Sequence, residues 1–178
     1  KEIGEIGETV VTVPPNFGNK ARVETLTAAK LAGLKVEHIV DEPIAAALYY
    51  AFEGGFRFDG HFAIYSLGGG TFDISIIKVE GQNINVLDSA GVQRLGGDDF
   101  DVCLQKIVKK KFKDEHDEDL EEPDYTKTDA EEDKKSLSKR EQIHVRSNKK
   151  NIAVTRTEFE REISSLVTLT EMLCESIL

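Results

Sequence analysis

The chain has 178 residues, of which 39% are hydrophobic, 31% charged and 7% aromatic. This composition excludes collagen and low-complexity disorder, and the presence of only two cysteines excludes a disulfide-rich scaffold. The net charge of −10 is concentrated in residues 114–133, which hold 12 acidic residues and one lysine. We therefore expect no nucleic-acid partner, because these acids would cancel the field of the neighbouring lysines. No apolar stretch approaches the roughly 20 residues of a membrane span, so no membrane association is expected.

The first third of the chain predicts alternating strands and helices. The β-branched run Thr9–Pro14 predicts a buried strand, and Asn19–Leu31 predicts a helix that Gly33 follows. Val36–Val40 predicts a second short strand, and the Ala-rich segment that begins at Asp41 predicts a helix ending near Gly54. Such a β-α-β-α unit favours a parallel or mixed sheet.

The rest of the chain opens with strands and ends with helices. Three strand-like runs at hairpin spacing occupy His61–Ser66, Phe72–Glu80 and Asn83–Ala90. Apolar residues at helical spacing then predict an amphipathic helix from Asp98 to Phe112, and the acidic segment after it predicts an exposed loop. The remaining predictions are a helix at Ala130–Leu137, a strand at Gln142–Arg146 and a final helix from Thr155.

The turn Gly68-Gly69-Gly70 lies between two predicted strands and is longer than a two-residue hairpin turn. Without side chains, consecutive backbone N–H groups can point into one concavity and hold an anion. Thr71 adds a hydroxyl and Asp73 a carboxylate, groups that suit phosphate oxygens and Mg²⁺. A flexible turn is the alternative interpretation of three glycines alone, but the strand–turn–strand setting favours phosphate binding.

This segment resembles the second phosphate loop of the 70-kDa heat-shock chaperone (DnaK-type) family, within the actin and sugar-kinase ATPase superfamily. The resemblance covers nearly the whole chain. It extends to Thr12-Val13-Pro14, to Asp41-Glu42-Pro43 with Ala45-Ala46-Ala47, and to Leu95-Gly96-Gly97-Asp98-Asp99-Phe100-Asp101. These motifs together disfavour a small-molecule kinase of the same superfamily.

The resemblance implies an α/β chain with a partial actin-like, ribonuclease H-like ATPase fold. Residues 1–58 would form the end of lobe I with a connecting helix, and residues 59–178 most of lobe II. The implied function is that of an ATPase domain fragment, which couples ATP binding and hydrolysis to peptide binding in protein folding and the stress response. Implied ligands are ATP or ADP with Mg²⁺. Implied partners are unfolded peptide clients, bound by a peptide-binding domain outside this chain, a J-domain protein and a nucleotide exchange factor, all in the cytoplasm.

The resemblance also implies roles for single residues around the phosphates and the metal. The β- and γ-phosphates would be cradled by Gly68, Gly69, Gly70 and Thr71. The nucleotide backbone would be approached closely by Gly96 and Gly97. The catalytic positions would be Asp73, in the shell of Mg²⁺, Glu42, near the metal, and Ser66.

Further roles concern the nucleoside and the coupling between domains. The nucleoside contacts would come from Glu131, Lys134, Lys135 and Ser138. The i, i+3, i+7 spacing of Glu131, Lys134 and Ser138 puts them on one helical face, although an ordinary solvated face is the alternative. Interdomain coupling would involve Pro14 and Arg22.

Ser66 is a departure, because the family usually has an aspartate at the head of this loop. A serine hydroxyl brings no negative charge and cannot accept a proton from water, and losing such a base lowers rates by about 10²–10⁴. The alternative function is therefore a divergent nucleotide-binding, chaperone-like regulatory module with little ATP turnover. We expect the fragment alone to be inactive, because the family's first phosphate loop and catalytic lysine lie outside it.

Overall fold

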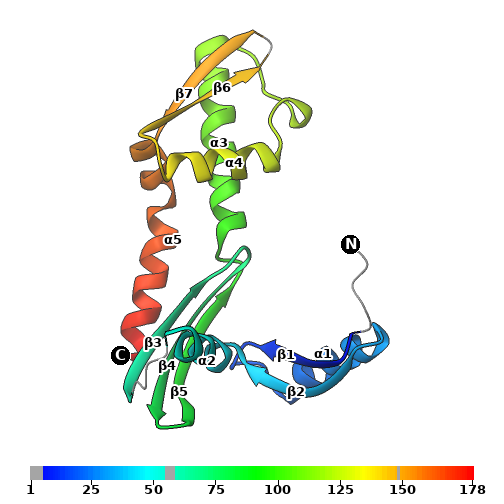
Figure 1. Ribbon diagram of the computed structural model, residues 1–178. Helices are drawn as coiled ribbons and strands as arrows, with labels where there is room; N and C mark the ends of the chain where they lie inside the picture. The colour runs from blue at the N-terminus through cyan, green and yellow to red at the C-terminus, as the bar shows by residue number, and fades with distance from the viewer. Residues whose placement is uncertain (1–5, 55–58, 148) are drawn as a thin grey trace. The chain divides into compact units, whose positions relative to one another are not determined.

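A computed structural model describes residues 6–54, 59–147 and 149–178 (Figure 1). The chain divides into two compact units. Unit 1 comprises Lys1–Ser66, Asp73–Gly91 and Leu173–Leu178, and unit 2 comprises Leu67–Phe72 and Val92–Met172. The predicted division at residue 58 adjoins residues 55–58, which lie outside the described part, and it stays a prediction.

Unit 1 begins with the expected β-α-β-α arrangement (Figure 1). Strands β1 (Glu8–Val13) and β2 (Lys35–Asp41) pair in parallel, as the pattern predicts. Helix α1 (Asn19–Leu31) connects them, and helix α2 (Glu42–Gly54) follows β2 directly. Because α2 starts where β2 ends, Glu42 is fixed at the junction of a strand and a helix.

The second part of unit 1 is a three-stranded sheet in the order β3–β4–β5. Its strands are β3 (Gly60–Leu67), β4 (Thr71–Glu80) and β5 (Asn83–Gln93), which confirms the three predicted runs. The central strand β4 is the most buried, and its Ile77 and Val79 pack with Ala47 of α2 in a small core. This packing holds β4 in place, and with it the carboxylate of Asp73.

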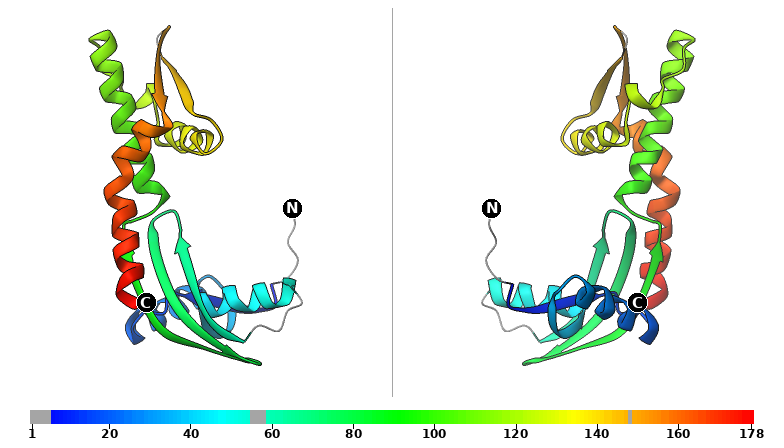
Figure 2. Two further views of the ribbon diagram at one scale, coloured as in Figure 1. Left: turned by 90° about the vertical axis from the view of Figure 1, so that its left-hand side faces the viewer. Right: turned by 90° about the vertical axis from the view of Figure 1, so that its right-hand side faces the viewer.

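Unit 2 is built on the long helix α3 (Gly97–His116). Helix α4 (Lys127–Leu137) and the hairpin β6–β7 lie against α3 in both views of Figure 2. The hairpin consists of the predicted β6 (Gln142–Ser147) and of β7 (Lys150–Thr155), a strand that the sequence analysis missed. Helix α5 (Arg156–Ile177) begins with the predicted capping box, in which Thr155 and Glu158 exchange hydrogen bonds.

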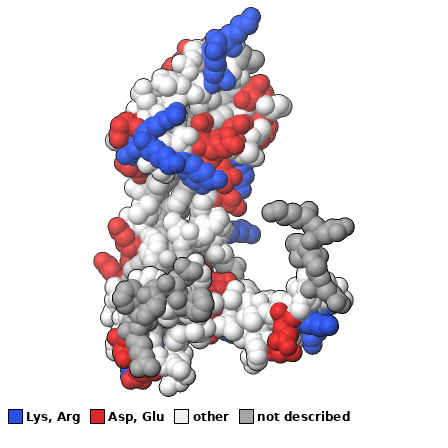
Figure 3. Space-filling model, viewed as in Figure 1, with Lys and Arg blue, Asp and Glu red and all other residues white. Residues whose placement is uncertain are grey.

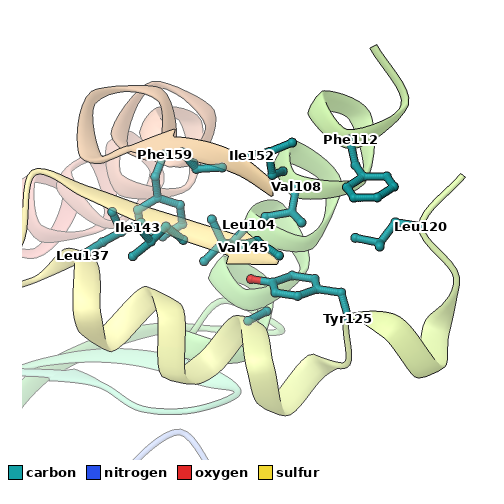
Figure 4. Close-up of a cluster of buried hydrophobic side chains, with 12 residues drawn as sticks. Leu104, Val108, Phe112, Leu120, Tyr125, Leu137, Ile143, Val145, Ile152 and Phe159 are labelled. Atoms are coloured by element: carbon teal, nitrogen blue, oxygen red, sulfur yellow. The ribbon is translucent and has the colours of Figure 1, made fainter. Parts of the chain in front are cut away.

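The core of unit 2 gathers residues from α3, α4, both strands of the hairpin and the start of α5 (Figure 4). Leu104, Val108 and Phe112 lie one turn apart on α3, which is why the apolar spacing of this segment predicts its buried face. Burying an apolar side chain of this size stabilises a fold by about 1.5–3 kcal/mol.

The acidic segment is largely exposed, as its composition predicts, but it also has structure of its own. It contains the end of α3, a 3₁₀ turn (Glu122–Asp124) and the first part of α4, and it buries Leu120 and Tyr125 in the core of unit 2. Its charges are intermixed with basic side chains over this unit (Figure 3), and ion pairs join Lys113 to Asp119 and Lys150 to Glu118. The burial of Leu120 and Tyr125 was not predicted, because the acidic residues around them in the sequence give no sign of a core that can accept them.

In the part of the chain that the structure describes, no helix combines the length and the apolar character that crossing a bilayer demands.

Candidate functional site

The turn between β3 and β4 is held by its carbonyl groups. The Gly68 N–H donates to the Thr71 carbonyl at 2.9 Å and closes the turn. The Gly68 and Gly69 carbonyls accept hydrogen bonds from the backbone N–H groups of Gly97, at 2.9 Å, and Asp98, at 2.7 Å. The start of α3 thus fixes the turn from one side.

Two amide N–H groups of the turn remain available. In the described part of the chain, the backbone N–H groups of Gly69 and Gly70 donate to no acceptor, and both residues are exposed. The Gly70 carbonyl is occupied as well, by the backbone N–H of Arg94 at 2.9 Å. A loop with its carbonyls engaged and two of its N–H groups free presents positive dipole ends to solvent, which is the requirement for binding an anion such as phosphate.

Gly96 lies in close contact with this turn. A Cβ atom added at Gly96 would lie 2.5 Å from the Gly69 carbonyl oxygen and 2.7 Å from that of Gly68, so no side chain fits there. At Gly97 an added Cβ would meet the Lys134 Nζ at 3.2 Å. The close approach that the structure shows at Gly96 is therefore to the backbone of the turn, and the expected approach of both glycines to a nucleotide stays a prediction.

Two carboxylates, Glu42 and Asp73, line one small cavity of about 60 Å³ in unit 1, together with Ser66 and Ser75. Burial raises the pKa of Glu42, and the negative charge of Asp73 raises it further. Burial also raises the pKa of Asp73. The cavity therefore disfavours two bare negative charges, and a cation would relieve this cost.

The donor set of this cavity suits Mg²⁺. It contains two carboxylates and two hydroxyls, all of them oxygen donors, as a hard cation requires. Among the described residues no three His, Cys, Asp or Glu side chains form a metal-binding group, so the ion would have to keep several of its waters. Mg²⁺ commonly binds in this way, through one or two carboxylates.

Arg22 stabilises the turn that follows β1. Its guanidinium pairs with the Asp41 carboxylate at 2.6 Å and donates to the carbonyls of Phe17, at 2.9 Å, and Pro15, at 3.3 Å. The Phe17 N–H donates to the Pro14 carbonyl at 3.0 Å. The predicted coupling residues Pro14 and Arg22 thus belong to one bonded turn, while their role in interdomain coupling stays a prediction.

A larger cavity of about 460 Å³ opens in unit 2 beside α4. Three of the predicted nucleoside residues, Lys134, Lys135 and Ser138, line it, and two of these, Lys134 and Ser138, belong to the set that the helical spacing placed on one face. Glu131 is not among the lining residues, and its carboxylate pairs with the Lys135 Nζ at 2.6 Å. The remaining walls come from the end of α4, from α3 and from α5, through Leu137, Phe100, Arg156, Phe159, Glu160 and Ile163.

Arg156 is a lining residue that the sequence analysis missed. Its guanidinium donates to the carbonyls of Leu137, at 2.8 Å, and Arg140, at 3.1 Å, and pairs with Glu141. It therefore satisfies carbonyl groups at the C-terminal end of α4, where a cation is favourable. The only sequence signal was its place beside the capping box of α5, which says nothing of a cavity.

The sequence matches a known protein family over its whole length. The family model described as Hsp70 protein matches residues 1–178. The chain belongs to the Hsp70 family. This confirms the resemblance found in the sequence, and the mixed α/β structure is consistent with part of an Hsp70 nucleotide-binding domain.

Individual Hsp70 relatives agree with the family match. A chaperone protein HscA homolog of Histophilus somni (strain 129Pt) is 38% identical over 175 residues, which is 98% of this chain and 28% of that protein. The chaperone protein HscA of Klebsiella pneumoniae is also 38% identical, over 177 residues and 28% of its length. The chaperone protein DnaK of Mycoplasmoides gallisepticum is 42% identical over 117 residues, 65% of this chain and 20% of that protein. The chain therefore spans less than a third of the length of these Hsp70 relatives.

Proposed function

We propose that this chain forms part of the ATPase domain of an Hsp70-type chaperone and binds ATP or ADP together with Mg²⁺. The observation that carries the proposal is the turn at Gly68–Gly70, whose carbonyls are engaged while two of its amide groups are free. The cavity beside α4, lined by Lys134, Lys135 and Ser138, would take the nucleoside. In the intact protein, binding and hydrolysis would switch a peptide-binding domain between states of low and high peptide affinity.

The glycine turn and the cavity of Glu42 and Asp73 would each contribute one part of the chemistry. The free amide groups of Gly69 and Gly70 would bind phosphate oxygens, with the Thr71 hydroxyl beside them in sequence. Glu42 and Asp73 would hold hydrated Mg²⁺, which when bound neutralises charge on the phosphate oxygens. Phosphoryl transfer to water depends mainly on such positioning and charge stabilisation rather than on covalent catalysis.

A second candidate is a nucleotide-binding regulatory module with little turnover. The observation that favours it is Ser66, which lines the cavity of Glu42 and Asp73 with a hydroxyl where the family usually has a carboxylate. Its hydroxyl can orient a water molecule, but it cannot accept the proton of that water near neutral pH. Under this candidate the protein would bind nucleotide and change conformation without rapid hydrolysis.

The partners and location follow from the same proposal. Unfolded peptide clients, a J-domain protein and a nucleotide exchange factor would work with the intact protein, in the cytoplasm. The relatives are named as chaperones, which supports the class of partner, and they cover far more sequence than this chain.

Calorimetric titration of the intact protein with ATP and MgCl₂ tests the nucleotide site. The test variants are Gly69→Ala and Gly70→Ala, because a Cβ at either position meets no atom within 4 Å and the fold can accommodate it. The added methyl group should crowd the free N–H groups and weaken binding about tenfold, the cost of one hydrogen bond to a charged group. Gly18→Ala, at an equally open position before α1, is the matched control and should bind as the wild type does. Equal affinity in all four proteins would exclude the turn as the phosphate site.

A further inference from the structure

Asp101 is a buried carboxylate on α3 that the proposed chemistry does not use. Its residue is 2% exposed, and its Oδ1 atom lies 2.6 Å from the Nζ of Lys134 on α4. The contact is an ion pair by distance, outside the alignment of a hydrogen bond. A carboxylate this buried needs a compensating charge, and removing either partner would leave the other uncompensated.

Lys134 has a second contact that connects it to the phosphate turn. Its Nζ donates to the Gly97 carbonyl at 2.8 Å, and the N–H of the same glycine donates to the Gly68 carbonyl at 2.9 Å. The contacts therefore form a continuous series from Asp101 through Lys134 and Gly97 to the turn. All four residues belong to unit 2.

The ammonium group of Lys134 keeps donors beyond the one that Gly97 occupies. An ammonium carries three N–H bonds, of which one donates to the Gly97 carbonyl, while the Asp101 carboxylate holds the group as an ion pair. Lys134 also lines the cavity beside α4, with a side chain that is 18% exposed. A flexible lysine held at two points has its remaining donors restricted in direction, and such restriction lowers the entropic cost of binding a ligand.

We propose that Asp101 is a positioning residue, which holds Lys134 so that its remaining N–H groups face the nucleoside cavity while its contact with Gly97 supports the phosphate turn. The inference rests on the proposed nucleotide site and adds to it. Occupation of the cavity and the geometry of the turn are then linked through one side chain, so the nucleoside and the phosphates bind cooperatively. Among the described residues, Lys135 has no such link, since its Nζ pairs with Glu131 on the exposed side of α4.

The ligand-free test is hydrogen exchange in the intact protein. In Asp101→Asn, Lys134 loses its charged partner and with it part of its hold on the Gly97 carbonyl. We expect the amide hydrogens of Gly97 and Asp98, which bind the turn, to exchange at least about tenfold faster than in the wild type, by mass spectrometry of the peptide that covers them. Glu131→Gln, which breaks the exposed pair with Lys135, is the matched control and should leave this exchange unchanged.

The ligand-binding test is a double-mutant cycle with adenosine and ADP. Asp101→Asn should weaken the binding of both at least fivefold, and ADP more than adenosine, because the turn is loosened too. In a Lys134→Met background, Asp101→Asn should have no further effect on either affinity, since the residue that it positions is gone. Asp101→Glu keeps the charge and should retain most of the wild-type affinity. It replaces the asparagine variant in this test if that variant does not fold.

The outcomes distinguish a failure of the role proposed for Asp101 from a failure of the proposed nucleotide site. Unchanged exchange at Gly97 and Asp98, or an equal loss of affinity with and without Lys134, would overturn the role of Asp101. A wild-type protein that binds neither adenosine nor ADP would overturn the proposed nucleotide site instead, and the exchange experiment would still decide whether Asp101 holds Lys134 to the turn.

Discussion

Ser66 lines the same small cavity as Glu42 and Asp73, yet its hydroxyl adds no negative charge there. The two carboxylates already have raised pKa values, from burial and, at Glu42, from the charge of Asp73. Without a bound cation, a third carboxylate would add to the electrostatic cost of negative charge in this cavity. With a cation present, the same carboxylate would strengthen its binding. The identity of this one side chain therefore decides between the two candidate functions.

The first prediction concerns hydrolysis in the intact protein. Ser66→Asp should raise the single-turnover rate of ATP hydrolysis at least about tenfold, the lower part of the range for a positioned base. ATP affinity should change far less, because the amide groups of the turn are untouched. Ser164→Asp adds the same charge at an exposed position on α5 and is the matched control. Equal rates in the wild type and Ser66→Asp would make the serine a tolerated substitution.

The second prediction concerns Gly96, whose added Cβ would collide with two carbonyl oxygens of the phosphate turn. Gly96→Ala should lower the free energy of unfolding by about 1–3 kcal/mol, because the backbones must separate to admit the methyl group. Urea denaturation measures the change. Gly69→Ala, which places a methyl group in open space on the same turn, should leave the stability unchanged or slightly higher. A Gly96→Ala protein as stable as the wild type would show that the turn can move aside freely.

Among the elements, helix α5 has several side-chain hydrogen bonds in its first turn. The Glu158 carboxylate accepts hydrogen bonds from the Lys111 Nζ at 2.8 Å and from the Thr155 N–H at 2.8 Å. Lys111 also donates to the Ala153 carbonyl at 2.6 Å, so one lysine joins α3, β7 and α5. These bonds favour the charged form of Glu158 and lower its pKa from 4.5 to about 2, with the bond from Lys111 as the largest cause.

The third prediction follows from this lowered pKa. A carboxyl group with a lower pKa in the folded state stabilises the fold above its unfolded pKa of 4.5, and loses this effect as the pH falls toward about 2. Since the Glu158 side chain is 42% exposed, solvent screening limits the contribution to about 1 kcal/mol. Glu158→Gln should therefore be less stable than the wild type at pH 6, by urea denaturation, and the difference should shrink below pH 4.

The control for this third prediction lies on the same helix. Glu171→Gln replaces an exposed glutamate of α5 and should follow the pH profile of the wild type. A constant difference between Glu158→Gln and the wild type from pH 6 to pH 2 would contradict a charge-dependent contribution of Glu158.

At the scale of the whole molecule, the chain corresponds to 28% of the length of its HscA relatives. Helix α1 has no buried residue, and Val23 and Leu31 on it are 61% and 85% exposed. Val10 on β1 is 60% exposed. Exposed apolar surface of this kind favours association with other polypeptide. Activity measurements therefore belong to the intact protein rather than to this chain in isolation.

The fourth prediction concerns the isolated 178-residue chain. We expect it to bind ATP with a dissociation constant above about 1 μM, because two free amide groups and one open cavity supply only part of the contacts that tight binding requires. Calorimetry with the intact protein in the same buffer provides the comparison. Submicromolar binding by the isolated chain would show that its own residues are sufficient for the site.

Several features of this protein could be derived from the sequence because they depend on neighbours along the chain. The bounds of α1, the capping box of α5, the buried face of α3 and the glycine turn all arise from residues within about four positions of each other. The motifs around Glu42, Gly68–Gly70 and Gly96 were enough to recognise the Hsp70 family.

Other features were decided only by the tertiary structure, because they depend on which distant segments pack together. Lys134 lies 37 residues from Gly97, and no local pattern indicates that its ammonium group binds that carbonyl and the Asp101 carboxylate. Leu120 and Tyr125 are buried although acidic residues surround them in sequence, because α3, α4 and the β6–β7 hairpin form a core that can accept them. Local sequence determines which elements form, whereas burial and charge pairing depend on the packing of those elements.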